Sequence, residues 1–172
     1  MRRLLLLRHA KAAPAAEPLA DLARPLAERG ERDARRIGER LRQQPSRPDL
    51  ILASPAARTL RTAELVAAAL DYPHGAIALE RRLYLAEPAT LGDVIAAQDP
   101  AVECLLIVGH NPGLTELVHE WLPSFTVDDL PTGAIVALDY AAADGWASLG
   151  GAAARLAYYD FPKNPAAPIT PR

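Results

Sequence analysis

Three short, continuous apolar runs constrain the fold of this chain more than any other feature. Residues 4–7, 50–53 and 105–108 read Leu-Leu-Leu-Leu, Leu-Ile-Leu-Ala and Leu-Leu-Ile-Val, and each run is bounded by polar residues or glycine. Four apolar residues in a row, without alternation, are typical of a strand buried on both faces. Such strands belong to parallel sheets that helices cover on both sides.

Segments with the apolar spacing of helices lie between these runs. There are four of them: residues 26–42, 56–70, 91–98 and 114–122. In the first, opposite charges four residues apart, such as Glu28 and Arg32, support the helix. Residues 134–140 and 156–159 are strand-like. The alternation predicts an α/β domain with a mostly parallel sheet between helix layers and one or two antiparallel edge strands.

Length and composition fit one domain, which we assign to residues 1–161, with a proline-rich C-terminal tail at residues 162–172. The 19 basic and 21 acidic residues give a net charge of −2, which does not favour nucleic-acid binding. No apolar run approaches the roughly 18 residues of a membrane span, and the first stops at Arg8, short of a signal peptide. With a single cysteine, Cys104, these features predict a cytoplasmic protein that binds neither nucleic acid nor membranes.

Polar clusters follow the three predicted strands. They are Arg8-His9, Ser54-Pro55-Ala56-Ala57-Arg58-Thr59 and Gly109-His110-Asn111-Pro112. The carboxyl ends of parallel strands meet at one edge of the sheet, where open α/β sheets bind their ligands. We therefore expect the three clusters to form one site.

In the first cluster a guanidinium and an imidazole follow a buried strand. Arg8 and His9 are either an ordinary surface strand end or a phosphate clamp beside a histidine nucleophile. An imidazole attacks phosphorus well only when it is neutral, and nearby arginines lower its pKa.

The second cluster predicts a helix start that binds an anion. Ser54 suits the N-cap and Pro55 the first helical position. Arg58 then lies in the first turn, where its guanidinium can reach an anion at the helix N-terminus. The alternative is an ordinary exposed arginine. Arg61, one turn further on, is either such an arginine or a support for the site.

The third cluster repeats this pattern. Asn111 suits an N-cap and Pro112 the first helical position. His110 precedes them on the turn, where it can donate to a phosphoryl oxygen. A single histidine on such a turn is more often structural, but beside the other two clusters His110 becomes a second active-site histidine.

In their order and spacing, the three clusters resemble the histidine phosphatase superfamily. The stretch Asp21-x-x-Arg24-Pro25-Leu26-x-x-x-Gly30 in so short a chain is most similar to the SixA-type phosphohistidine phosphatases. The resemblance implies a three-layer α/β/α sandwich of the phosphoglycerate-mutase-like type and a two-step phosphoryl transfer without metal or cofactor. It also implies that His9 is the nucleophile and that Arg8, Arg58 and His110 hold the phosphoryl oxygens. Four histidines without carboxylate or thiolate spacing likewise indicate no metal site.

The chain departs from the family pattern in two places. Ala10 stands where the broad superfamily has glycine, and no residue clearly matches the acid of its ester-cleaving members. Glu80, between two arginines, suits an ion pair better than a proton donor, whereas Glu87 could be an acid or a helix-start carboxylate. Arg24 could guard the rim of the site or form an ion pair. The lack of a clear general acid favours substrates with an N–P bond, because neutral imidazole leaves more readily than an alkoxide.

The sequence thus predicts a metal-independent phosphatase that binds phosphate and acts through a phosphohistidine. Its substrate is a phosphorylated protein, either a phosphohistidine carrier or a signalling domain. The alternatives are a small-molecule phosphomonoesterase or mutase with a small phosphorylated substrate, and a non-catalytic module that binds a phosphorylated ligand. A further alternative is an adaptor that docks through its arginine-rich helix.

Overall fold

The computed structural model describes residues 1–15, 21–141 and 145–165, and within them the chain forms one mixed sheet. Its strands lie in the order β3-β2-β4-β1-β5-β6. They are β1 (Arg2–Arg8), β2 (Leu50–Ala53), β3 (Ala78–Leu79), β4 (Cys104–Gly109), β5 (Ile135–Tyr140) and β6 (Arg155–Asp160). The first four pair in parallel, whereas β5 pairs antiparallel with β1, and β6 pairs antiparallel with β5. The predicted mostly parallel sheet is confirmed.

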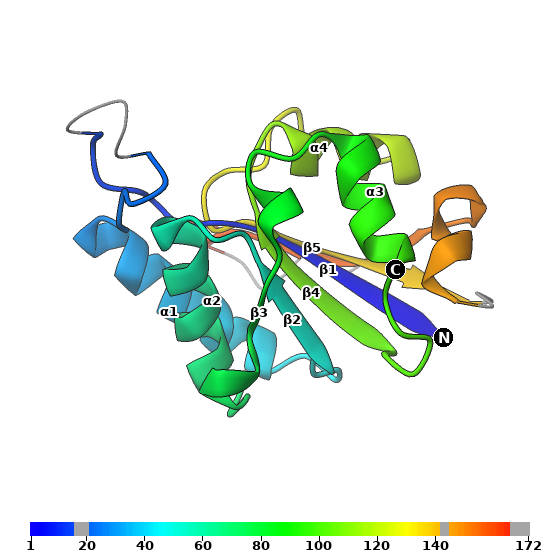
Figure 1. Ribbon diagram of the computed structural model, residues 1–172, viewed down its shortest axis with the longest axis horizontal. Helices are drawn as coiled ribbons and strands as arrows, with labels where there is room; N and C mark the ends of the chain where they lie inside the picture. Colours follow the sequence, from blue (N-terminus) through cyan, green and yellow to red (C-terminus); the bar gives the residue numbers. More distant parts are fainter. Residues whose placement is uncertain (16–20, 142–144, 166–172) are drawn as a thin grey trace.

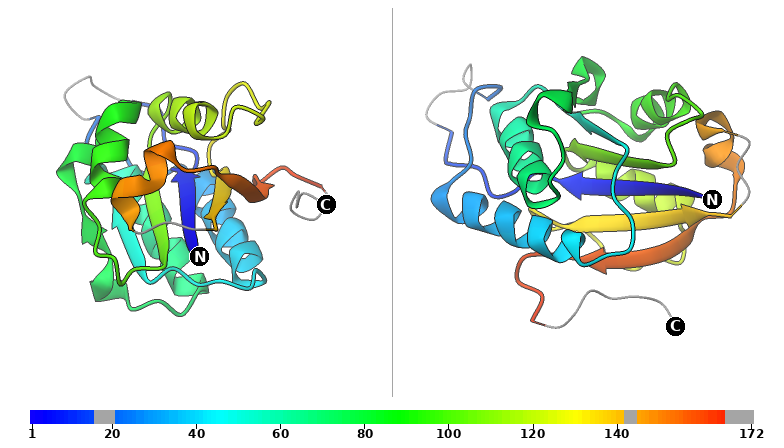
Figure 2. Two further views of the ribbon diagram at one scale, coloured as in Figure 1. Left: turned by 90° about the vertical axis from the view of Figure 1, so that its right-hand side faces the viewer. Right: turned by 90° about the horizontal axis from the view of Figure 1, so that it is seen from below.

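Helices cover both faces of this sheet (Figure 1). They are α1 (Glu28–Arg42), α2 (Ala57–Ala69), α3 (Pro88–Ala96) and α4 (Gly113–Trp121). The pair α1 and α2 lies on one face and the pair α3 and α4 on the other, and the views in Figure 2 agree. All four helices were predicted, with ends that differ by a few residues, and the three-layer α/β/α class is confirmed.

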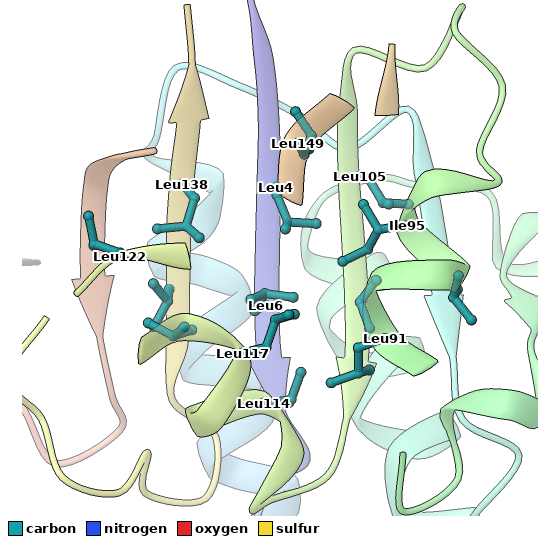
Figure 3. Close-up of a cluster of buried hydrophobic side chains, with 14 of the residues drawn as sticks. Leu4, Leu6, Leu91, Ile95, Leu105, Leu114, Leu117, Leu122, Leu138 and Leu149 are labelled. Carbon is teal, nitrogen blue, oxygen red and sulfur yellow. The ribbon is translucent and has the colours of Figure 1, made fainter. Parts of the chain in front are cut away.

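The alternation of β1 explains why two helix layers are needed. Leu4 and Leu6 point into the core under α3 and α4, which Figure 3 shows with Leu91 and Leu117 from those helices. The intervening leucines of β1 pack in the core with α1 and α2. A strand with apolar side chains on both faces is stable only between two apolar layers.

The two predicted helix caps are wrong in position. Ser54 and Asn111 each lie before the cap residue, because α2 begins after Ala56 and α4 after Pro112. The Ser54 hydroxyl hydrogen-bonds to a histidine, as described below, and only weakly to the N–H of Ala56, at 3.4 Å. The Asn111 side chain still accepts from the N–H of Thr115, at 3.3 Å.

Backbone hydrogen bonds join the polar clusters to one another just after the strands end. The N–H of His9 donates to Gly109 O at 3.0 Å, and the N–H of Ser54 donates to Val108 O at 3.1 Å. His9, Ser54 and the start of the β4–α4 turn are therefore neighbours at the carboxyl edge of the sheet. This arrangement of the three clusters is the one that the sequence predicts.

Two glycines allow close approaches around the same edge. A Cβ on Gly30 would lie 2.1 Å from Lys11 O, and one on Gly113 would lie 1.9 Å from Ala86 O. Only glycine allows the N-terminal turn of α1 and the start of α4 to pack this closely on neighbouring backbone.

After β6, which lies beside β5 in the right-hand view of Figure 2, the chain continues along α1. Arg40 donates to the carbonyls of Phe161 and Asn164 and forms an ion pair with Asp160. The rest of the predicted tail, residues 166–172, lies outside the described residues.

Candidate active site

His9 is buried at the end of β1 with one ring nitrogen fixed. Its Nδ1 lies 2.8 Å from the carbonyl oxygen of Ala10. A carbonyl only accepts, so this contact places the proton on Nδ1 and leaves the lone pair of Nε2 free. The backbone N–H of Ala10 donates to the hydroxyl of Thr62 at 3.0 Å, which ties this turn to α2. His9 thus presents one unprotonated nitrogen.

The pKa of His9 is lowered to about 4. Burial is the largest cause, and the charges of Arg58 and Arg8 add to it, whereas the bond to Ala10 opposes it. A lowered pKa was expected from the sequence, but its main cause is desolvation and not the nearby arginines that were expected to lower it. His9 is neutral at physiological pH.

His110 lies beside His9, and the two ring centroids are 5.4 Å apart. Its Nε2 lies 2.7 Å from the Ser54 hydroxyl, and its Nδ1 lies 3.5 Å from Nη2 of Arg58. Burial, followed by the neighbouring His9 and Arg58, lowers the pKa of His110 to about 3. The two imidazoles predicted to meet are therefore adjacent and both neutral.

Arg58 is only 2% exposed, so it is not the ordinary surface arginine of the alternative interpretation. It donates from Nη1 to the carbonyl of Asp21 at 2.7 Å and from Nη2 to the Asp21 carboxylate at 3.1 Å. Its buried Nε has no hydrogen-bond partner within the described residues. A buried guanidinium with an unused donor is costly unless an anion completes its contacts.

Arg8 approaches the site from the other side. Its Nη1 donates to Leu130 O and lies 3.3 Å from the Asp129 carboxylate. Asn111 donates to the same carboxylate at 2.7 Å. Asp129, which the sequence argument missed, therefore links Arg8 to the turn that carries His110. Only its place before the β5 strand could have indicated it.

These side chains border one cavity of about 270 Å³. Its lining residues are Arg8, His9, Lys11, Ala12, Arg24, Arg58, Leu85, His110, Asn111 and Thr132. Four of them are cations and none of these described residues is a carboxylate. Arg8 and Arg24, like Arg58, have a buried Nε without a partner in the described part of the chain. The cavity therefore fits a compact anion with several acceptor oxygens.

The candidate acids lie elsewhere. Glu80 accepts from the N–H of Arg82 and forms an ion pair with its guanidinium at 3.0 Å, and these bonds lower the pKa of Glu80. Glu87 is exposed and precedes α3. Neither lines the cavity. Arg24 does both things expected of it: it lines the cavity and forms an ion pair with Asp21 at 3.2 Å.

Sequence reasoning missed Tyr84 and the role of Asp21. The Tyr84 hydroxyl donates to the Asp21 carboxylate at 2.5 Å, and its ring packs edge-on against His110. Tyr84 and Arg58 lower the pKa of Asp21, so this carboxyl is ionised. The contact joins residues 63 positions apart, and no local pattern in the sequence indicates it.

A larger cavity of about 430 Å³ lies beside β6, and its lining residues differ in kind from those around His9. It is lined mostly by apolar side chains such as Leu122, Phe125 and Leu156, and no imidazole borders it.

Across residues 1–15, 21–141 and 145–165, no group of three or more histidine, cysteine or acidic residues could hold a metal ion. None of the described helices is long and apolar enough to cross a membrane.

Comparison with known proteins agrees with this geometry. The model of the histidine phosphatase superfamily (branch 1) matches residues 4–83. An uncharacterized protein of Mycobacterium tuberculosis is 38% identical over 111 residues, which are 64% of this chain and 66% of that relative. The match thus spans just under two thirds of the relative's length.

Two solved structures assigned to the phosphohistidine phosphatase SixA are also similar. The one from Nakamurella multipartitia is 27% identical with a TM-score of 0.80, over 94% of this chain and 96% of that one. The one from Agrobacterium tumefaciens is 33% identical with a TM-score of 0.71, over 92% and 97%. The chain therefore belongs to the histidine phosphatase superfamily, in its SixA-type branch.

Proposed function

We propose that this protein is a phosphatase that acts through a phosphohistidine at His9, with protein-bound phosphohistidine as its substrate. One observation carries the proposal. The bond from Nδ1 to Ala10 leaves Nε2 of His9 as an unprotonated nucleophile beside a cavity lined by four cations. A neutral nucleophile and a charged oxyanion site are the two requirements of phosphoryl transfer to histidine.

The first step forms a bond between Nε2 of His9 and phosphorus while the bond from phosphorus to the leaving nitrogen breaks. Arg8, Arg58 and His110 hold the equatorial oxygens, whose charge these donors stabilise. The leaving imidazole takes a proton from solvent. In the second step water attacks phosphorus, the bond to His9 breaks, and inorganic phosphate leaves. His9 then regains its free Nε2.

The absence of a carboxylate among the described lining residues supports an N–P substrate. Asp21 lies close to Arg58, but its lowered pKa makes it a poor proton donor. An alkoxide leaving group depends strongly on a general acid, which contributes about 10²–10⁴-fold. An imidazole leaving group needs none, because solvent can protonate its ring nitrogen.

Two other functions remain as alternatives. A small-molecule phosphomonoesterase or mutase would use the same nucleophile, and a non-catalytic module would use the same anion site. The second is less well supported, because binding alone does not require the neutral His9 and its fixed tautomer. We place the protein in the cytoplasm. The single cysteine, Cys104, supports this, because one free, buried thiol cannot form an internal disulfide and suits a reducing compartment.

Trapping the covalent intermediate tests the proposal. Brief incubation with a radiolabelled phosphohistidine peptide should label the protein with an acid-labile, base-stable phosphoryl group. His9→Ala should abolish both the label and phosphate release. The kcat/KM for the peptide should exceed that for p-nitrophenyl phosphate. Labelling of His9→Ala at the wild-type level would refute the assigned nucleophile, and equal kcat/KM values would refute the preference for N–P bonds.

A further inference from the structure

One exposed leucine lines the cavity that contains His9, and a second lies two residues before Arg24, which also lines it. Leu85 lines the cavity and is 54% exposed, and Leu22 is 48% exposed. Their chain neighbours, Tyr84 and Asp21, are joined by the 2.5 Å hydrogen bond described above. Each leucine therefore lies one residue along the chain from the same contact. We call Leu22 and Leu85 the apolar lip.

The backbone of Leu85 has an unusual conformation. Its φ is +48°, and only one other non-glycine residue in the described ranges, Asp71, has a positive φ. Leucine rarely adopts this left-handed conformation, and such residues concentrate at functional sites. Core packing does not explain the conformation, because the side chain is exposed. The neighbouring residue Ala86 is held by the close approach of Gly113 to its carbonyl.

Cations lie next to the lip. Lys11 and Arg24 line the same cavity as Leu85. Their segments are joined by backbone hydrogen bonds from Ala13 to Pro25 O and from Ala27 to Lys11 O, both of 2.9 Å. The exposed ammonium of Lys11 has no ion pair in the part of the chain that the structure describes. Lys11 and Arg24 are thus additional to the groups that hold the phosphoryl oxygens.

We propose that the apolar lip, Lys11 and Arg24 form a docking surface for the protein that carries the phosphohistidine. The partner would present apolar and acidic side chains next to that residue. This inference rests on the proposed function. A cavity of about 270 Å³ can hold a phosphoryl group and its leaving ring but not a folded protein, whereas the lip is exposed to solvent. Exposed leucines and cations at a rim match a protein surface of complementary charge.

Three phosphohistidine peptides of equal length test this surface. The first carries glutamate and leucine around the phosphohistidine, the second replaces glutamate with lysine, and the third replaces leucine with serine. Phosphoimidazole serves as the small substrate, because it has no neighbouring amino-acid residues. The wild-type protein should hydrolyse the first peptide with a kcat/KM about tenfold above the other two. The difference between the first and second peptides should shrink at high salt.

Variants separate the lip from the chemistry. Leu22→Ser, outside the cavity, should remove most of the preference for leucine and leave phosphoimidazole hydrolysis unchanged. Leu85→Asn should lower kcat/KM for the first peptide more than for phosphoimidazole, since asparagine tolerates the left-handed backbone. Lys11→Gln should reduce the discrimination between glutamate and lysine. Leu79→Asn is the matched control: Leu79 is 55% exposed, lies in β3 and does not line the cavity, so this variant should behave as wild type.

The outcomes distinguish the two proposals. Equal kcat/KM for the three peptides, or the same loss in Leu79→Asn as in Leu22→Ser, would overturn the docking surface and leave the phosphatase intact. A wild-type protein that hydrolyses neither phosphoimidazole nor any peptide would overturn the proposed function, and the docking surface with it.

Discussion

The hydroxyl oxygen of Ser54 lies 2.7 Å from Nε2 of His110, and both side chains are buried. A hydroxyl can donate or accept, so Ser54 can stabilise either neutral tautomer of His110. Arg58 can only donate, so its contact with His110 favours an unprotonated Nδ1. When a phosphoryl oxygen takes that place, Ser54 can donate to Nε2 while Nδ1 carries the proton. Ser54 is thus a positioning residue for His110.

Ser54→Ala should therefore lower kcat by about tenfold, less than the 10²–10³-fold that follows the loss of an oxyanion donor. Steady-state kinetics with a phosphohistidine peptide measures the effect. Thr59→Ala is a suitable control, because its hydroxyl hydrogen-bonds to the carbonyls of Ser54 and Ala56 without touching His110. The control should lose about 1 kcal/mol of stability and keep its kcat. Equal kcat values for the two variants would contradict a role of Ser54 in catalysis.

The carboxylate of Asp21 occupies a donor of Arg58 that an anion could use. Asp21→Asn keeps the backbone carbonyl that accepts from Nη1 but removes one negative charge from the edge of the site. Inorganic phosphate should then bind about threefold to tenfold more tightly, which corresponds to about 0.7–1.4 kcal/mol. Isothermal titration calorimetry measures this Kd. Weaker phosphate binding in the variant would show that the carboxylate mainly orients Arg58 and does not compete with the ligand.

The fold could be predicted from the sequence because short stretches of consecutive residues determine its main strands. Four apolar residues in a row at β1, β2 and β4 leave few arrangements other than buried parallel strands. The first residues of the helices were harder to predict from the sequence. Serine or asparagine followed by proline is the usual pattern of a cap, but at Ser54 a tertiary contact with His110 takes the side chain that a cap would use.

The centre of the site was also predictable, because His9, Arg58 and His110 each follow or begin an element whose place in the sheet is known. The surrounding contacts were not. Asp21 meets Arg58 across 37 residues, and Asp129 meets Arg8 across 121. Such pairings depend on the paths of loops, which no periodic pattern encodes.

The ion pair between Arg3 and Asp139 tests the fold separately from the site. The guanidinium of Arg3 holds both oxygens of the buried Asp139 carboxylate, at 2.6 and 2.8 Å, and thereby joins β1 to β5. Asp139→Ala leaves this guanidinium without its carboxylate partner and also removes the ion pair of Asp139 with Arg155, so it should lower the free energy of unfolding by about 3 kcal/mol. Denaturation in urea measures it. Because the pair lies at the opposite end of β1 from His9, kcat should be unchanged at temperatures where the variant is folded; a reduced kcat would contradict this separation.

Stability should fall in acid because of His9 and His110. Their folded pKa values, about 4 for His9 and about 3 for His110, lie below the usual value of 6.5, so the unfolded chain binds more protons between those limits. Their contribution is complete above pH 6.5 and is lost as the pH falls toward 4 and 3. Each pKa unit corresponds to about 1.4 kcal/mol, so the loss should reach about 3 kcal/mol from His9 and about 5 kcal/mol from His110. Urea denaturation of the wild type and of His9→Asn, which cannot titrate, measures it. The variant should show a shallower fall between pH 6.5 and 4; parallel curves would mean that His9 keeps its ordinary pKa and is not desolvated as a nucleophile.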